Sequence, residues 1–186
     1  MKTHSTSRAV IAAIVAMMSI CAHPSCAVET NAVPKRIGIY DSRAIAYAYF
    51  WSEAHQQKIN SVAKAAKEAK AAGQTARFQE LEAALKKESE RNHLQVFSTA
   101  PVDDILAGMT RQVAQIQRDA GVAQLVSMWD KKTLKEHRHA ERIDITDRLL
   151  REFKLTEKQT EVAADLRKKQ PLPLEKAQEM LRQGKL

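Results

Sequence analysis

The segment formed by residues 42–99 decides the fold, and it reads SRAIAYAYFWSEAHQQKINSVAKAAKEAKAAGQTARFQELEAALKKESERNHLQVFST. It contains no proline and a single glycine, Gly73. It consists mainly of Ala, Lys, Glu and Gln, which are among the strongest helix formers. The segment therefore predicts two long helices that are broken near residues 72–74.

Within this segment, one set of positions follows a helical period. In the first predicted helix these positions recur three and four residues apart, at Ile45, Ala48, Ser52, His55, Ile59, Val62, Ala66 and Ala69. In the second helix, Phe78, Leu81 and Leu85 continue the same spacing. The pattern predicts a coiled-coil hairpin over about residues 42–98 with a thin, alanine-rich seam. The seam weakens where Glu88 and Asn92 take positions that should be apolar.

Three short stretches outside the hairpin are typical of β-strands. They are residues 36–41 (RIGIYD), 122–129 (VAQLVSMW) and 141–145 (ERIDI). The fold class is therefore mainly α with a small β-sheet (α+β), with the hairpin inserted between strand 1 and strands 2 and 3. Three strands leave open edges and exposed apolar faces, so we expect the chain to oligomerise.

Helices are also predicted on the C-terminal side of the hairpin. Pro101 suits a first helical turn and Gly121 a C-terminal stop, so a helix is expected over about residues 101–120. Thr156 and Gln159 have the spacing of a capping box, which opens a helical tail at residues 156–186. The domain formed by residues 35–155 precedes that tail.

The N-terminal residues 1–27 have the pattern of a secretory signal peptide. Lys2 and Arg8 are basic, residues 9–20 are apolar, and small residues permit cleavage after Ala27. An apolar run of about 12–14 residues is too short for a membrane span, which needs about 20. We therefore expect export across the inner membrane to the periplasm, with a short linker at residues 28–34.

Composition and charge narrow the function classes. The 186 residues suffice for one domain with an appendage, and the net charge of +8 makes acidic partners plausible. Both cysteines, Cys21 and Cys26, lie in the predicted signal peptide, where lipidation of one of them is an alternative to cleavage after residue 27. No Gly-rich phosphate loop is present, so we expect activity without ATP and without a cofactor.

The order of these elements resembles the Skp/OmpH-like family of periplasmic chaperones. The resemblance rests on the strand at residues 36–41, the helical hairpin, the apolar strand at residues 124–129 and the closing sequence IDITDRLL at residues 143–150. It covers roughly residues 35–153. It implies a homotrimer whose strands form a central body and whose arms enclose unfolded outer-membrane proteins.

We therefore expect a non-enzymatic, ATP-independent holdase. Basic heads on the arm would attract acidic segments of a client, and aliphatic stems would contact apolar ones. The candidate client-binding residues are the basic side chains Lys58, Lys64, Lys67, Lys70, Arg77, Lys86 and Lys87 and the aromatic run Tyr47, Tyr49, Phe50 and Trp51.

Other interpretations remain open. The main alternative is a structural or adaptor protein of the envelope that docks on one fixed partner. His137 and His139 have a spacing that can hold a metal, but no third ligand accompanies them. Asp103 and Asp104 are adjacent, and first-turn helix stabilisation explains them better than acid–base chemistry. Export and the lack of a groove-reading motif argue against nucleic-acid binding.

Overall fold

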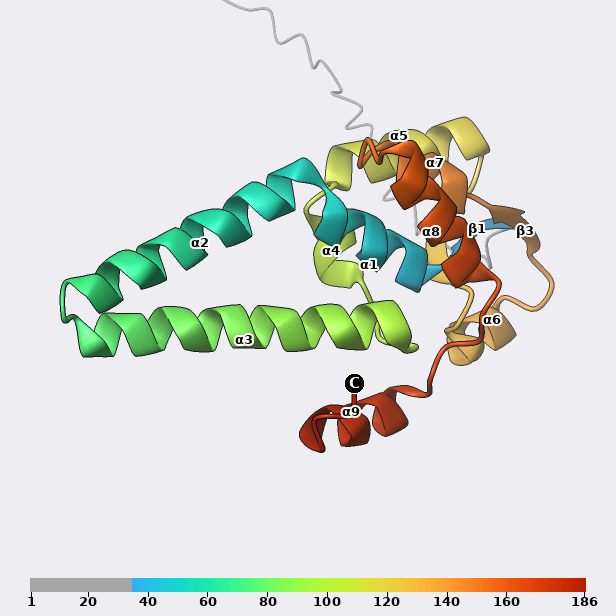
Figure 1. The fold of residues 1–186 in the computed structure, drawn as a ribbon. Helices are drawn as coiled ribbons and strands as arrows, with labels where there is room; N and C mark the ends of the chain where they lie inside the picture. Colours follow the sequence, from blue (N-terminus) through green and yellow to red (C-terminus); the bar gives the residue numbers. More distant parts are fainter. Residues whose placement is uncertain (1–34) are drawn as a thin grey trace, which may run out of the picture. The chain divides into compact units, whose positions relative to one another are not determined.

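The computed structural model describes residues 35–186. The predicted signal peptide, its two cysteines and the linker at residues 28–34 lie outside the described residues. The described part is mainly helical with a small sheet, as predicted (Figure 1). None of its helices is both long enough and apolar enough to cross a membrane.

The sheet is parallel and has β1 (Arg36–Tyr40) at its centre. Its neighbours are β2 (Leu125–Ser127) and β3 (Glu141–Asp144), in the order β2-β1-β3. Gly38 pairs with Leu125 on one side and Ile143 on the other. A Cβ atom at Gly38 would lie 2.8 Å from the Leu125 Cδ2 atom, so a larger residue there would displace that side chain. All three predicted strands are confirmed, although β2 is shorter than expected.

Both faces of this sheet are covered by the chain itself. On one face Tyr40 and Ile145 join the main core with residues of the surrounding helices. On the other face Ile37 and Val126 are buried against Ala140. The expectation that the strands leave apolar faces exposed is therefore wrong, because the segment that follows β2 folds back over the second face. The outer edges of β2 and β3 pair with no other strand among residues 35–186.

The hairpin segment forms three helices rather than two. These are α1 (Ser42–Trp51), α2 (Glu53–Ala71) and α3 (Thr75–Phe97). The predicted turn at residues 72–74 is confirmed, and Gly73 has a φ of +69°, which favours glycine. The break at Ser52 was not predicted. The Ser52 backbone is extended there, and its side-chain oxygen accepts a hydrogen bond from the His55 N–H, which caps α2.

The break at Ser52 separates two packing environments. Residues of α1 such as Ile45 and Phe50 belong to the main core. The α2 and α3 helices pack on each other through a separate small cluster of Ala66, Ala69 and Leu81, with Phe78 partly buried beside it. These helices extend away from the sheet as a pair, which we call the arm (Figure 1). The alanine-rich seam is confirmed, whereas the supercoiling of a coiled coil stays a prediction.

Six further helices complete the described chain. They are α4 (Asp103–Ala107), α5 (Thr110–Ala120), α6 (Lys131–Glu136), α7 (Thr146–Arg151), α8 (Glu157–Arg167) and α9 (Leu174–Arg182). The single helix predicted over residues 101–120 is divided into α4 and α5 at Gly108. The capping box of Thr156 and Gln159 is confirmed. In the tail, α8 packs against α1 and α9 against α3, so it belongs to the same compact unit.

Candidate functional site

The seven predicted basic residues all lie on the arm, and all seven are exposed. Lys58, Lys64, Lys67 and Lys70 are on α2, and Arg77, Lys86 and Lys87 are on α3. Three of them form ion pairs with carboxylates of their own helix, at Glu68, Glu80 and Glu90. The amine of Lys70 lies 5.2 Å from the centre of the Phe78 ring. Such exposed pairs contribute little to stability and leave the cations accessible to a partner.

The charge of the arm is uneven between its two helices. By the printed sequence, α2 carries four Lys and two Glu, a net charge of +2. In α3 four Lys or Arg residues balance four Glu residues, a net charge of zero. The arm is thus less cationic than its lysine content indicates, and its excess positive charge belongs to α2.

The aromatic run of α1 is divided between the core and the surface. Phe50 is buried in the main core, and Tyr49 packs beside it, with ring centres 5.3 Å apart. Tyr47 and Trp51 lie one turn apart, with ring centres at 6.3 Å, and Trp51 is 53% exposed. The helical period places these two rings on the outer side of α1. Core packing therefore accounts for part of the run, and Tyr47 and Trp51 remain for a surface role.

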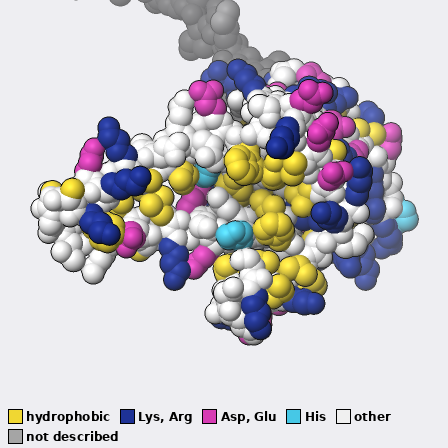
Figure 2. Space-filling view, in the orientation of Figure 1, with side chains coloured by type: hydrophobic (Ala, Val, Ile, Leu, Met, Phe, Trp, Pro, Cys, Tyr) yellow, Lys and Arg dark blue, Asp and Glu magenta, His cyan; other side chains and the backbone are white. Residues whose placement is uncertain are grey.

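An apolar groove of about 350 Å³ joins these aromatic residues to the end of α3. Its α1 wall contains Tyr47, Phe50 and Trp51, and its α3 wall contains His93 and Phe97. Phe97 is 46% exposed, and its ring stacks with that of His93 at 6.2 Å. Hydrophobic side chains gather on this face, over α1 and the adjoining end of α3 (Figure 2). We call this feature the root groove, because it lies where the arm joins the body.

The sequence did not reveal the α3 wall of the root groove. Phe97 ends α3 next to Leu94 and Val96, and no pattern in this short apolar stretch marks Phe97 as the exposed member. It lines the same groove as Trp51 because the chain turns back at Gly73. The signal that marks Trp51 and Phe97 is the high exposed fraction of their side chains, which is known only from the structure.

A buried histidine lies beside the groove, at the first turn of α2. The His55 side chain is almost fully buried against the rings of Tyr49 and Phe50, with centres at 4.7 Å and 5.1 Å. Its Nε2 atom lies 3.7 Å from Glu88 Oε1, and neither ring nitrogen forms a hydrogen bond with a described residue. The guanidinium of Arg91 bonds Glu88 and Asp104, which fixes this end of α3.

His55 makes the stability of the protein depend on pH. Burial lowers the pKa of His55, and the cations of Arg91 and Lys58 add to this, while Glu88 opposes it. The unfolded chain therefore binds a proton near pH 6.5 that the folded chain does not, and the free energy of unfolding decreases as pH falls below about 6.5. We expect His55→Gln to reduce this loss between pH 7.5 and 5, measured by urea unfolding. An equal loss in both proteins would contradict the assignment, and His139→Gln at an exposed position is the control.

A second polar cluster joins the ends of all three strands. Asp41 follows β1, and its carboxylate forms a fully buried ion pair with Arg43 at 3.0 Å. The Trp129 indole N–H donates to Asp41 Oδ1 at 2.9 Å, and the Asp41 N–H donates to the Thr146 hydroxyl at 3.1 Å. The Arg43 guanidinium lies 4.7 Å from the centre of the Trp129 ring. Because its groups are paired with one another, this cluster serves the fold.

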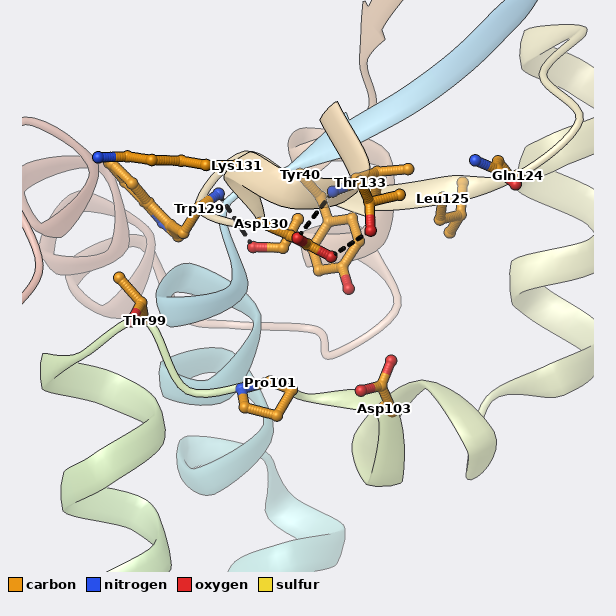
Figure 3. A pocket seen from close by; sticks show the side chains of 12 residues that line it. Tyr40, Thr99, Pro101, Asp103, Gln124, Leu125, Trp129, Asp130, Lys131 and Thr133 are labelled. Carbon is orange, nitrogen blue, oxygen red and sulfur yellow. Dashed lines mark hydrogen bonds between the residues drawn. The ribbon is translucent and has the colours of Figure 1, made fainter. Parts of the chain in front are cut away.

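A cavity of about 450 Å³ adjoins this cluster at the carboxyl ends of β1 and β2 (Figure 3). We call it the strand-end cavity. Its wall includes Tyr40, Trp129 and Asp130 and, from the segment after the arm, Pro101 and Asp103. Such a position is the usual ligand site in open sheets of parallel strands. No local pattern in the sequence marks this cavity, because its walls come from three separate segments, at residue 40, residues 99–103 and residues 124–133.

The other residues considered for chemistry are not brought together. Residues 35–186 contain no group of three His, Cys, Asp or Glu side chains able to hold a metal. His137 contacts the Gln124 amide, and His139 accepts a hydrogen bond from Arg138. Asp103 lines the strand-end cavity, whereas Asp104 bonds Arg91. The adjacent carboxylates therefore do not form an acid–base pair.

Comparisons with known proteins add no assignment. No protein-family model matches the chain, and neither a curated protein nor a solved structure matches it significantly. The resemblance to the Skp/OmpH-like family stays a prediction from the sequence.

Proposed function

We propose that this protein is an ATP-independent holdase chaperone that binds unfolded outer-membrane or envelope proteins. The observation that carries the proposal is the pair of exposed aromatic side chains, Trp51 and Phe97, on the root groove. They are the two most exposed large hydrophobic side chains among the described residues. Exposed apolar surface of this kind marks an interaction site.

The groove and the arm offer different contacts to an unfolded chain. The groove takes up an apolar side chain, which removes both surfaces from water. The exposed cations of α2 attract acidic segments and increase the rate of encounter. Many weak contacts spread over both surfaces suit a client with no fixed structure, whereas one deep pocket would select a single ligand.

The compartment and the assembly belong to the same proposal. We place the protein in the periplasm because of its predicted signal peptide. Activity in that compartment has to proceed without nucleotide. We propose a homotrimer from the family resemblance and from the open outer edges of β2 and β3. Light scattering of the purified protein at micromolar concentration tests this, and a monomer with a native circular dichroism spectrum would exclude it.

Replacing the two exposed aromatic residues tests the binding site. We expect Trp51→Ser combined with Phe97→Ser to weaken client binding by roughly tenfold or more, because burying one large apolar side chain contributes about 1.5–3 kcal/mol. The measurement is suppression of aggregation of an unfolded outer-membrane β-barrel diluted from urea, at several ratios of protein to client.

The matched control is Val162→Ser, which removes the third exposed large hydrophobic side chain, on α8 and outside the lining of the groove. It should protect the client as well as the unmodified protein does. Equal protection by the double variant would contradict the proposal. If the protein protects no unfolded client but stably captures one folded envelope protein, the adaptor alternative is favoured.

A further inference from the structure

We propose that the strand-end cavity is a binding site for a protonated amine or guanidinium group, held between the Tyr40 hydroxyl and the Asp103 carboxylate. This site is separate from the root groove and does not depend on client binding. The ligand class is a cationic head on a short aliphatic chain, either a free amine or a lysine or arginine side chain.

Tyr40 is the first reason for this assignment. Tyr40 is only 4% exposed, and it lines the cavity wall. Its hydroxyl forms no hydrogen bond with another residue of the described chain. Figure 3 shows it directed into the space between β2 and the segment from Pro101 to Asp103. The hydroxyl is therefore open to the cavity, where a ligand can hydrogen-bond it.

The charge around the hydroxyl is the second reason. Burial raises the pKa of Tyr40, and the carboxylates of Asp103 and Asp130 raise it further, so the hydroxyl lies in a negative field. Lys131 is the one cation among the lining residues, and its side chain extends away from Asp103 (Figure 3). A cationic ligand therefore fits this field, and an anionic one does not.

Asp103 is the carboxylate that remains available. The Asp130 carboxylate already accepts hydrogen bonds from the Thr133 N–H and hydroxyl, at 3.0 Å and 2.6 Å. The Asp103 carboxylate forms no ion pair or hydrogen bond with any other residue in the range 35–186. Its carboxylate and the Tyr40 hydroxyl both face the open part of the cavity (Figure 3). Pro101 and Leu125 supply apolar wall for the aliphatic part of the ligand.

The size of the cavity agrees with a small ligand. Its volume of about 450 Å³ lies within the range of about 300–1,000 Å³ that is usual for small-molecule sites. The Trp129 ring forms part of its wall and supplies an internal reporter. The sequence contains two tryptophans, so Trp51→Phe leaves Trp129 as the only one.

The test is a fluorescence titration of the purified Trp51→Phe protein, repeated by calorimetry. The probes are agmatine, which carries a guanidinium and a primary ammonium group, and Nα-acetyl-lysine amide, which presents a side-chain ammonium. Nα-acetyl-norleucine amide is the neutral control of similar shape. Asp103→Asn and Tyr40→Phe are the test variants, and Asp165→Asn, at an exposed carboxylate on α8, is the control.

We expect at least one cationic probe to bind saturably and the norleucine derivative not to bind. Asp103→Asn should weaken that binding by about tenfold, because a charge-assisted contact is lost, and Tyr40→Phe should weaken it less. Stronger binding of agmatine would identify a guanidinium ligand, and stronger binding of the lysine derivative an ammonium ligand. Absence of saturable binding by both cations, equal binding of the neutral probe, or equal affinity in both test variants with native circular dichroism would overturn the proposal.

Discussion

Replacing Asp41 with Ala is expected to lower the free energy of unfolding by about 3–5 kcal/mol. The carboxylate is fully buried, and its removal leaves the buried Arg43 guanidinium without its partner. The same change deletes the acceptor of the Trp129 indole N–H and the N-terminal cap of α1. Since domains are stable by about 5–15 kcal/mol, this loss is a large fraction of the total.

Urea unfolding followed by circular dichroism measures this loss. The double variant Asp41→Ala and Arg43→Leu separates the missing charge from the missing contacts. Removing both ions should restore part of the stability, because no uncompensated charge remains in the core. Asp165→Ala is the control at an exposed carboxylate. An ordinary hydrogen bond contributes about 1 kcal/mol. A smaller loss than this for Asp41→Ala would contradict a central role for this ion pair.

The sequence predicted the elements that have a strong period or a distinct terminator. The strand at residues 36–41 has alternating apolar residues, and the turn at Gly73 interrupts a segment rich in helix formers. The break at Ser52 was missed, because Ser52 and His55 fit the same three-four spacing as the seam. Only the extended backbone at Ser52 and its capping hydrogen bond distinguish two helices from one.

The sites were harder to predict than the fold, for a physical reason. Exposure of the arm lysines follows from their spacing on a helix, and it was predicted. The root groove depends on the meeting of Trp51 and Phe97, and the strand-end cavity on that of Tyr40 and Asp103. Each pair is far apart in the chain, and neither is marked by a local pattern. The buried ion pair of Asp41 was missed too, because a charged residue after a strand is ordinarily expected to be exposed.

Shortening the arm should separate its role from that of the root groove. We would replace residues 63–83 with a short Gly-Ser turn, which removes the outer part of α2 and α3 and four of the seven candidate basic residues. The deleted seam around Ala66 and Leu81 is a cluster distinct from the main core, so the body should stay folded. We expect client affinity to fall by roughly tenfold or more, since each tenfold step corresponds to only about 1.4 kcal/mol of lost contacts.

A second variant of full length distinguishes lost charge from lost surface. In it, Lys64, Lys67 and Lys70 are replaced by Glu, which reverses charge on α2 without shortening the arm. Exposed charges act mostly on the rate of encounter and are screened beyond about 8 Å at physiological salt. This variant should therefore capture the client more slowly at low salt and should approach the unmodified protein as salt rises. If the shortened protein is folded and protects the client as well as the full-length protein does, the arm is not a binding element and the root groove alone would have to hold the client.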